Sequence, residues 1–150
     1  MQNIPKKISY KNKIFRTNLG AYGSIYGLHS CDISELIQLL TRKFGTRLCY
    51  VGLQGSYLRG EATDSSDIDI MVVIDGLTVA DLDHYRAIIE SLGDFDKSCG
   101  FICSKKDLEH WNPLEICNLL HSTKDYFGIL RKLVPAYTEQ DIRNFLKFSI

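Results

Sequence analysis

Two carboxylates, Asp67 and Asp69, alternate with Ile68 and Ile70 in the stretch SSDIDIMVVID, residues 65–75. In a strand, successive side chains point to opposite faces, so the aspartates share one face and the isoleucines share the other. Two like charges this close are costly unless a cation neutralises them, and a hard divalent cation takes oxygen ligands of this kind. The pattern therefore predicts a strand that presents a metal-binding carboxylate pair. The alternative, a pair of solvent-exposed strand-end residues, fits the surrounding Ile and Val poorly.

A glycine-serine turn precedes the carboxylates. An apolar run ends in Gly55 and Ser56. Glycine permits close backbone approach, and the amides that follow it can open a helix whose positive N-terminal end favours phosphate. The sequence has neither Gly-x-Gly-x-x-Gly nor Gly-Lys-Ser/Thr, so a dinucleotide fingerprint and a P-loop are not supported. These residues predict a phosphate cradle beside the carboxylate pair.

The stretch GSYLRGEATDSSDIDI, residues 55–70, resembles the signature of the DNA polymerase beta-like nucleotidyltransferase superfamily. Within that superfamily it is similar to the minimal and antibiotic-modifying nucleotidyltransferases. The resemblance rests on the Gly-Ser turn, the Arg-Gly pair, the Ser before the first Asp and the two alternating carboxylates, all in this order. It implies that an acceptor hydroxyl attacks the alpha-phosphate of a nucleoside triphosphate and that pyrophosphate leaves.

The resemblance also implies roles for individual residues. Asp67 and Asp69 would bind Mg²⁺ or Mn²⁺, while Gly55 and Ser56 would hold the terminal phosphates. Two further candidates for phosphate contact are Arg59 and Ser66. For Arg59 the alternative is an ordinary solvated charge, and for Ser66 it is a turn residue that starts the strand.

Members of the superfamily carry a third carboxylate on a later strand, which helps to deprotonate the acceptor. Alignment of residues 101–103 with that strand puts the acidic position near Gly100, which has no side chain. Asp94 and Asp96 share strand parity with Gly100, and we expect Asp96 to be the catalytic residue. The other readings are that Asp94 takes this role or that the third carboxylate is absent.

Two functions follow from these readings. The first is a Mg²⁺-dependent nucleotidyltransferase that modifies a hydroxyl of a small molecule, a protein or an RNA end. The second is a nucleotide-binding or antitoxin-like regulatory module with a degraded catalytic site. Catalysis requires a further carboxylate near Asp67 and Asp69, whereas nucleotide binding alone does not.

Hydrophobic periodicity and capping residues predict the elements that position these residues. We expect a small mixed β-sheet of the α/β (α+β) class, with helices packed mainly on one face and further helices at the C-terminus. The predicted strands cover residues 47–54, 67–74 and 97–104. The predicted helices begin at Asp32, Thr78, Lys105, Pro113 and Thr138.

The composition indicates one globular domain. The 150 residues are 45% hydrophobic and 24% charged, and Lys+Arg and Asp+Glu are both 18, so no global basic excess points to nucleic acid. We divide the chain into a basic, aromatic-rich arm over 1–30, a nucleotidyltransferase core over 31–110 and C-terminal helices over 111–150. The last helix stays periodic to its end without a stop signal. This predicts a chain that continues, or a helix that docks on a homodimer mate or another protein.

No secretory signal and no run of about 20 apolar residues is present, so we expect a cytoplasmic protein that does not enter the membrane. The 5 cysteines include no Cys-x-x-Cys, and the 4 histidines are scattered. The cysteines are therefore expected to be reduced core thiols, and a zinc site is not supported.

Overall fold

A mixed four-stranded sheet forms the centre of the molecule. The computed structural model describes residues 23–55, 69–92 and 99–148. The strand order is β3-β2-β1-β4; β1 runs antiparallel to β2 and β4, and β2 runs parallel to β3. The predicted mixed sheet is confirmed. The strands are β1 (Leu48–Gln54), β2 (Asp69–Ile74), β3 (Cys99–Ser104) and β4 (Lys124–Phe127).

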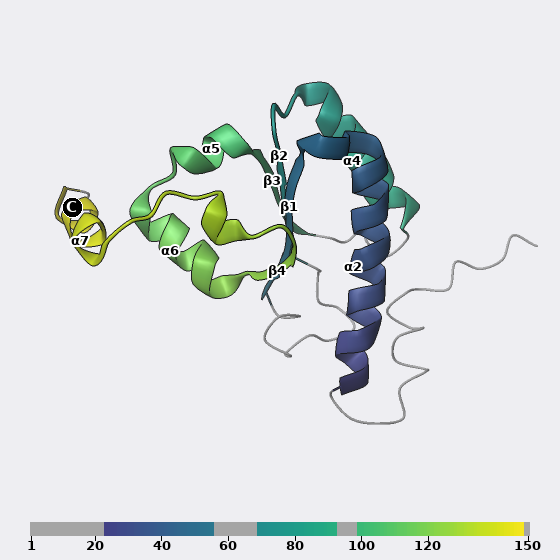
Figure 1. Cartoon of the computed structure of the whole chain (residues 1–150), viewed down its shortest axis with the longest axis horizontal. Helices are drawn as coiled ribbons and strands as arrows, with labels where there is room; N and C mark the ends of the chain where they lie inside the picture. Colours follow the sequence, from purple (N-terminus) through teal and green to yellow (C-terminus); the bar gives the residue numbers. More distant parts are fainter. Residues whose placement is uncertain (1–22, 56–68, 93–98, 149–150) are drawn as a thin grey trace, which may run out of the picture.

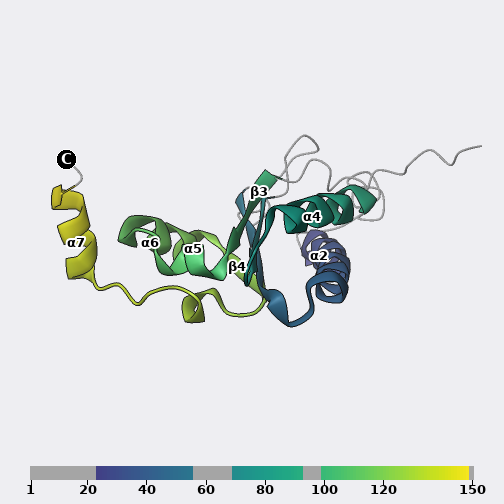
Figure 2. The ribbon, with the colours of Figure 1, turned by 90° about the horizontal axis from the view of Figure 1, so that it is seen from above.

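Helices cover both faces of this sheet. Figure 1 shows the sheet between two groups of helices, and Figure 2 shows α2 and α4 on one side with α5 and α6 on the other. The expectation that helices pack mainly on one face is therefore corrected. The α-helices are α2 (Gly23–Phe44), α4 (Val79–Ser91), α5 (Lys105–Glu109), α6 (Pro113–Ser122) and α7 (Glu139–Phe148), and the short 3-10 helices are η1 (Gly45–Arg47) and η3 (Leu130–Lys132).

The composition of β2 explains the two-sided packing. Every side chain from Ile70 to Ile74 is at most 1% exposed. Ile70, Val72 and Ile74 belong to the apolar cluster with α2 and α4, while Met71 and Val73 belong to the cluster with α5 and α6. A strand that is apolar at every position must be covered on both faces, because each face would otherwise expose apolar surface to water.

The helix α2 packs through residues at helical spacing. Ile33, Leu36, Leu40 and Phe44 are all buried in the cluster that faces β1 and β2. The helix ends before Gly45, whose φ of +56° suits a glycine that follows a helix. Its predicted start at Asp32 is wrong, because the helix already begins at Gly23 and Asp32 lies within it.

An ion pair ties together the end of the sheet opposite Gly55. Thr78 and Asp81 form the predicted capping box of α4. Asp81 is 6% exposed and also accepts hydrogen bonds from the Arg47 guanidinium. Arg47 makes two further hydrogen bonds, to the backbone oxygens of Asp75 (3.1 Å) and Gly76 (2.8 Å). The hydrogen bond from Arg47 is the main cause that holds the pKa of the Asp81 carboxyl well below its ordinary value.

The C-terminal part contributes a strand as well as helices. Asn112 caps α6 with Pro113 in its first turn, and Thr138 pairs with Asp141 at the start of α7, as predicted. β4, which adds an edge strand to the sheet, is not among the predicted strands. α7 buries none of its described residues and extends away from the sheet (Figure 1). Among the described helices, none is long and apolar enough to cross a membrane.

The ion pair makes acid stability depend on Asp81. Because the folded-state pKa of Asp81 is lowered, its stabilising contribution is complete above the ordinary value of 3.8 and is lost as the pH falls through the folded-state pKa. We expect Asp81→Asn to lower the melting temperature at neutral pH and to flatten the loss of stability in acid. Thermal unfolding from neutral pH to below about pH 3 measures both effects. Asp83→Asn, at an exposed position of the same helix, is the control and should leave both unchanged.

Candidate active site

Gly55 and Asp69 lie in contact where β1 ends and β2 begins. The antiparallel register pairs Gln54 with Asp69, so the next residue of the chain, Gly55, reaches the Asp69 side chain. Gly55 has a φ of +74°. A Cβ atom added to Gly55 would overlap the Asp69 carboxylate, with its Cγ only 2.9 Å away. The backbone of the predicted phosphate turn therefore lies directly against one of the predicted metal ligands.

The Asp69 carboxylate is suited to a cation. Asp69 is half-buried, and its side chain makes no hydrogen bond or ion pair with any residue that the structure describes. A carboxylate partly removed from water without a counter-charge is costly, and a divalent cation with oxygen ligands relieves that cost. Within the described residues no three His, Cys, Asp or Glu side chains gather as a metal site. Asp69 can thus supply one ligand, and any others must come from elsewhere.

Asp69 shares its sheet face with Met71 and Val73. Strand alternation and the two apolar clusters put these three residues on the face covered by α5 and α6, opposite Ile70. The carboxylate therefore lies at the first residue of β2, at one end of this apolar face.

Hydrogen bonds between β1 and the chain after α6 fix the neighbourhood of Gly55. Gln54 donates from Nε2 to Oγ1 of Thr123 (2.8 Å), and Tyr50 donates from Oη to Oδ1 of Asp125 (2.6 Å). Gly52 lies between them, and a Cβ at that position would overlap the Tyr50 hydroxyl and approach Cγ2 of Thr123 to 2.7 Å. A glycine in β1 is thus needed for Tyr50 to reach β4.

Thr123 and Asp125, the polar partners of β1, were not among the residues predicted from the sequence. Burial is the main cause that raises the pKa of the Tyr50 phenol far above its ordinary value, and the hydrogen bond to Asp125 adds to it, so the hydroxyl stays protonated and donates. Asp125 projects from β4 on the same face as Gly52, its register partner. The available signal was the occurrence of Gly52 and Gln54 inside an otherwise apolar strand.

The register of β3 bears on the third carboxylate. Cys99 pairs with Asp69, and Gly100 pairs with Ile70. Register partners share a face, so position 100 lies on the face opposite Asp69. The position of Gly100 is therefore no argument for an acidic side chain beside Asp69. Asp94 and Asp96 lie outside the described residues, and their role stays a prediction.

Most of the predicted site residues are not placed by the structure. Ser56, Arg59, Ser66, Asp67, Asp94 and Asp96 all lie outside the described residues, and their roles stay predictions. Of the predicted set, the structure describes Gly55 and Asp69 and brings them together.

Two of the described thiols, those of Cys49 and Cys103, belong to the apolar packing under α5 and α6. Cys103 is buried under α5, and burial raises the pKa of its thiol to about 12. Burial also raises the pKa of the Cys49 thiol. Because a thiolate is the reactive form, neither group is a nucleophile at neutral pH.

A family model and a curated relative both match this chain as a nucleotidyltransferase. Residues 33–115 match a family model described as a nucleotidyltransferase domain. A curated relative from Methanocaldococcus jannaschii, provisionally named a protein adenylyltransferase, is 30% identical over 99 residues, which cover 61% of this chain and 67% of the relative. These matches confirm the resemblance seen at residues 55–70.

Two solved structures share the fold. One is the spectinomycin adenyltransferase from Enterococcus faecialis with ATP and spectinomycin, with a TM-score of 0.51 and 18% identity over 79% of this chain; the match spans 64% of that protein's length. The other is a variant of the toxin-antitoxin complex MntA-HpeT, with a TM-score of 0.50 and 21% identity over 77% of this chain and 87% of that one.

Because Gly55 contacts Asp69, we expect an alanine to lower the free energy of unfolding more at position 55 than at position 76. Gly55→Ala places a Cβ against the Asp69 carboxylate, whereas Gly76→Ala has a similar φ of +60° and no atom within 4 Å. Gly76→Ala should therefore lower the free energy of unfolding by only about 1 kcal/mol, because alanine disfavours the left-handed conformation. Gly55→Ala should cost about 1–3 kcal/mol more, because the carboxylate must move. Urea unfolding of the two variants measures the free energies.

The double variant Gly55→Ala/Asp69→Ala should regain part of the unfolding free energy that Gly55→Ala loses, because the overlapping carboxylate is gone. Equal losses of unfolding free energy in Gly55→Ala and Gly76→Ala, or no recovery in the double variant, would contradict the contact between Gly55 and the Asp69 carboxylate.

Proposed function

The chain belongs to the nucleotidyltransferase domain family, and from this premise we propose that it transfers a nucleoside monophosphate from a nucleoside triphosphate, with Mg²⁺ or Mn²⁺, to a hydroxyl group. The observation that carries the proposal is the contact of Gly55 with Asp69. It joins a turn able to approach phosphate to a carboxylate able to bind a cation, in the order that the family signature requires.

In the proposed reaction, an oxygen of the acceptor forms a bond to the alpha-phosphorus. The bond from that phosphorus to the bridging oxygen breaks, and pyrophosphate leaves with the bonding electrons. The acceptor hydroxyl gives its proton to a general base. The backbone at Gly55, with Ser56, holds the terminal phosphates, while Arg59 and Ser66 are further proposed phosphate contacts.

Asp69 and Asp67 would hold the metal ion. The half-buried Asp69 carboxylate, without a partner in the described part of the chain, fits this role. Bound there, Mg²⁺ or Mn²⁺ would offset the negative charge of the phosphates and of the departing pyrophosphate.

The general base takes the proton of the acceptor hydroxyl. We assign it to Asp96, with Asp94 as the alternative. β3 itself, CGFICS, carries no Asp or Glu, and its register partner for Asp69 is Cys99. This observation favours a second candidate function, a nucleotide-binding or antitoxin-like module that binds the metal-nucleotide complex without turning it over.

The acceptor is proposed from the relatives. A protein hydroxyl agrees with the name of the Methanocaldococcus relative, and a small hydroxylated molecule agrees with the spectinomycin enzyme. An RNA end is the third class of acceptor. A contact with another protein or a second copy has support in α7, where Leu146 is 44% exposed and Phe148 is 89% exposed.

Nucleotide binding should depend on both the divalent ion and Asp69. We expect calorimetric titration of ATP with Mg²⁺ to show saturable binding that chelator removes and that Asp69→Asn weakens by about tenfold or more, because a carboxylate ligand is lost. Asp75→Asn, just past the other end of β2, is the matched control and should bind as the wild type does. Equal affinity in Asp69→Asn, or in the presence of chelator, would contradict the assignment.

Release of pyrophosphate separates the two candidate functions. Wild type incubated with ATP, Mg²⁺ and a panel of protein, aminocyclitol and RNA acceptors should release pyrophosphate with at least one of them. Asp96→Asn should reduce this rate by about 100-fold or more, as expected for loss of a general base. Unchanged turnover in Asp96→Asn removes that residue from the mechanism, and Asp94→Asn then tests the alternative.

Binding of Mg²⁺ and ATP without pyrophosphate release from any acceptor would instead support the regulatory module.

A further inference from the structure

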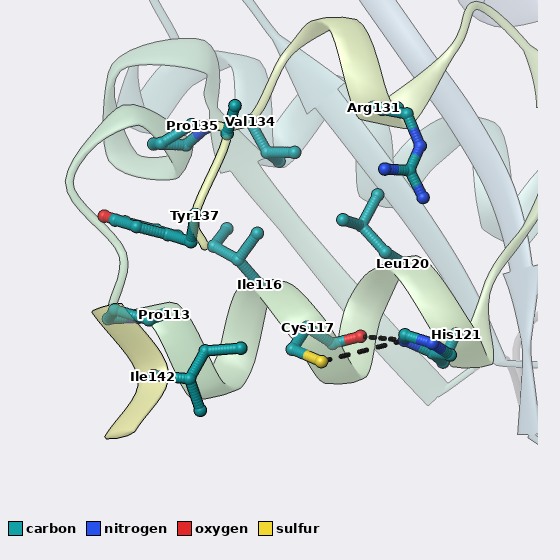
Figure 3. A pocket seen from close by; sticks show the side chains of 11 residues that line it. Pro113, Ile116, Cys117, Leu120, His121, Arg131, Val134, Pro135, Tyr137 and Ile142 are labelled. Atoms are coloured by element: carbon teal, nitrogen blue, oxygen red, sulfur yellow. Dashed lines mark hydrogen bonds between the residues drawn. The ribbon is translucent and has the colours of Figure 1, made fainter. Parts of the chain in front are cut away.

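A cavity of about 320 Å³ lies beside α6, on the side where the chain returns from η3 toward α7. Figure 3 shows its walls: one face of α6, the segment 134–137 and Ile142 from the first turn of α7. None of its lining residues belongs to the turn at Gly55 or to β2. The cavity is therefore separate from the candidate active site.

The walls are held by contacts outside the cavity. Residues of α6 at helical spacing, including Ile116 and Leu120, form the floor. Leu130 is 2% exposed and anchors η3 in the apolar cluster under α5 and α6. Tyr137 donates from Oη to the backbone oxygen of Trp111 (2.9 Å), which fixes the returning segment at its other end. The opening is thus bounded by anchored elements on two sides.

The cavity combines apolar walls with positive charge at one end. Its lining contains no Asp or Glu, and its cationic side chain is Arg131. The Arg131 guanidinium is directed toward Leu120 and His121 (Figure 3), and it makes no ion pair or hydrogen bond within the part of the chain that the structure describes. A guanidinium beside apolar surface and without a carboxylate partner is suited to an anion.

His121 adds a second polar group at the same end. Its Nδ1 lies 2.8 Å from the backbone oxygen of Cys117, and since a carbonyl oxygen can only accept, Nδ1 carries the proton of that hydrogen bond. In the neutral ring Nε2 is then a hydrogen-bond acceptor, and within the described residues no hydrogen bond engages it. Because Nδ1 is already engaged and Cys117 is the only other metal-ligating side chain in the lining, the arrangement does not suit a metal ion.

We propose that this cavity binds a small apolar molecule that carries one anionic group. Arg131 pairs with the anion, and Ile116, Leu120, Val134, Tyr137 and Ile142 enclose the apolar body. The volume is at the lower end of the range of small-molecule sites, so the ligand has about the size of one or two fused rings. This site goes beyond the proposed nucleotidyl transfer and does not depend on it.

Titration with 1-anilinonaphthalene-8-sulfonate, an aromatic molecule with a single sulfonate, tests the proposal through its fluorescence. We expect one saturable site per chain. Arg131→Gln removes the charge at an exposed position and should weaken binding by about fivefold or more. Ala136→Glu places a carboxylate on the wall and should weaken binding to a similar degree. Arg143→Gln is the matched control, since Arg143 is an exposed residue of α7 outside the cavity.

The neutral probe N-phenyl-1-naphthylamine separates the charge from the apolar contact. It should bind more weakly than the sulfonate to wild type, and its affinity should not change in Arg131→Gln. Equal affinity of the sulfonate for Arg131→Gln and Arg143→Gln would overturn the proposal, as would the absence of a saturable site in the wild type. Unchanged circular dichroism spectra verify that each variant is folded.

Discussion

The contact between the backbone of Gly55 and the carboxylate of Asp69 is the constraint around which the proposed site is built. It exists because the antiparallel register of β1 and β2 pairs Gln54 with Asp69, and because Gly55 has a φ of +74°. A side chain at position 55 would occupy the space of the carboxylate. The same glycine that lets the backbone turn therefore also leaves room for the acidic group.

Burial of β2 on both faces keeps this contact in place. α2 and α4 cover one face, and α5 and α6 cover the other, so β2 cannot slide without exposing a continuous row of apolar side chains. On its other edge, β1 is supported by the hydrogen bond from Tyr50 to Asp125 of β4 and by the one from Gln54 to Thr123, the residue before β4. The carboxylate of Asp69 thus projects from a rigid strand end, as a residue that must hold a cation in a defined position needs to do.

Much of this arrangement could be predicted from the sequence, because it depends on local rules. Alternation in SDIDI and the glycine-serine turn indicated the site, and capping residues indicated where α4, α6 and α7 begin. The strand β4 escaped prediction because four residues, KDYF, carry too short a pattern, and their pairing with β1 comes from distant chain segments. The start of α2 was missed because Asp32 resembles a cap whether or not the helix already extends before it.

The position of a third carboxylate could not be predicted from the pattern of one strand. Parity along one strand says which residues share a face, but it does not say which face meets Asp69. That depends on the pairing of β3 with β2, which places Cys99 beside Asp69 and Gly100 beside Ile70. A general base from outside β3 must then depend on how segments distant in the sequence come together, which no pattern within one strand contains.

Paramagnetic broadening of backbone amide signals by Mn²⁺, bound together with a non-hydrolysable nucleoside triphosphate, tests the central claim most directly. We expect the signals of Gly55 and Asp69 to disappear first, while those of Gly76, beyond the other end of β2, and of α7 persist. Broadening centred on another part of the chain, or spread evenly over it, would contradict the assignment of the metal and nucleotide to the contact between Gly55 and Asp69.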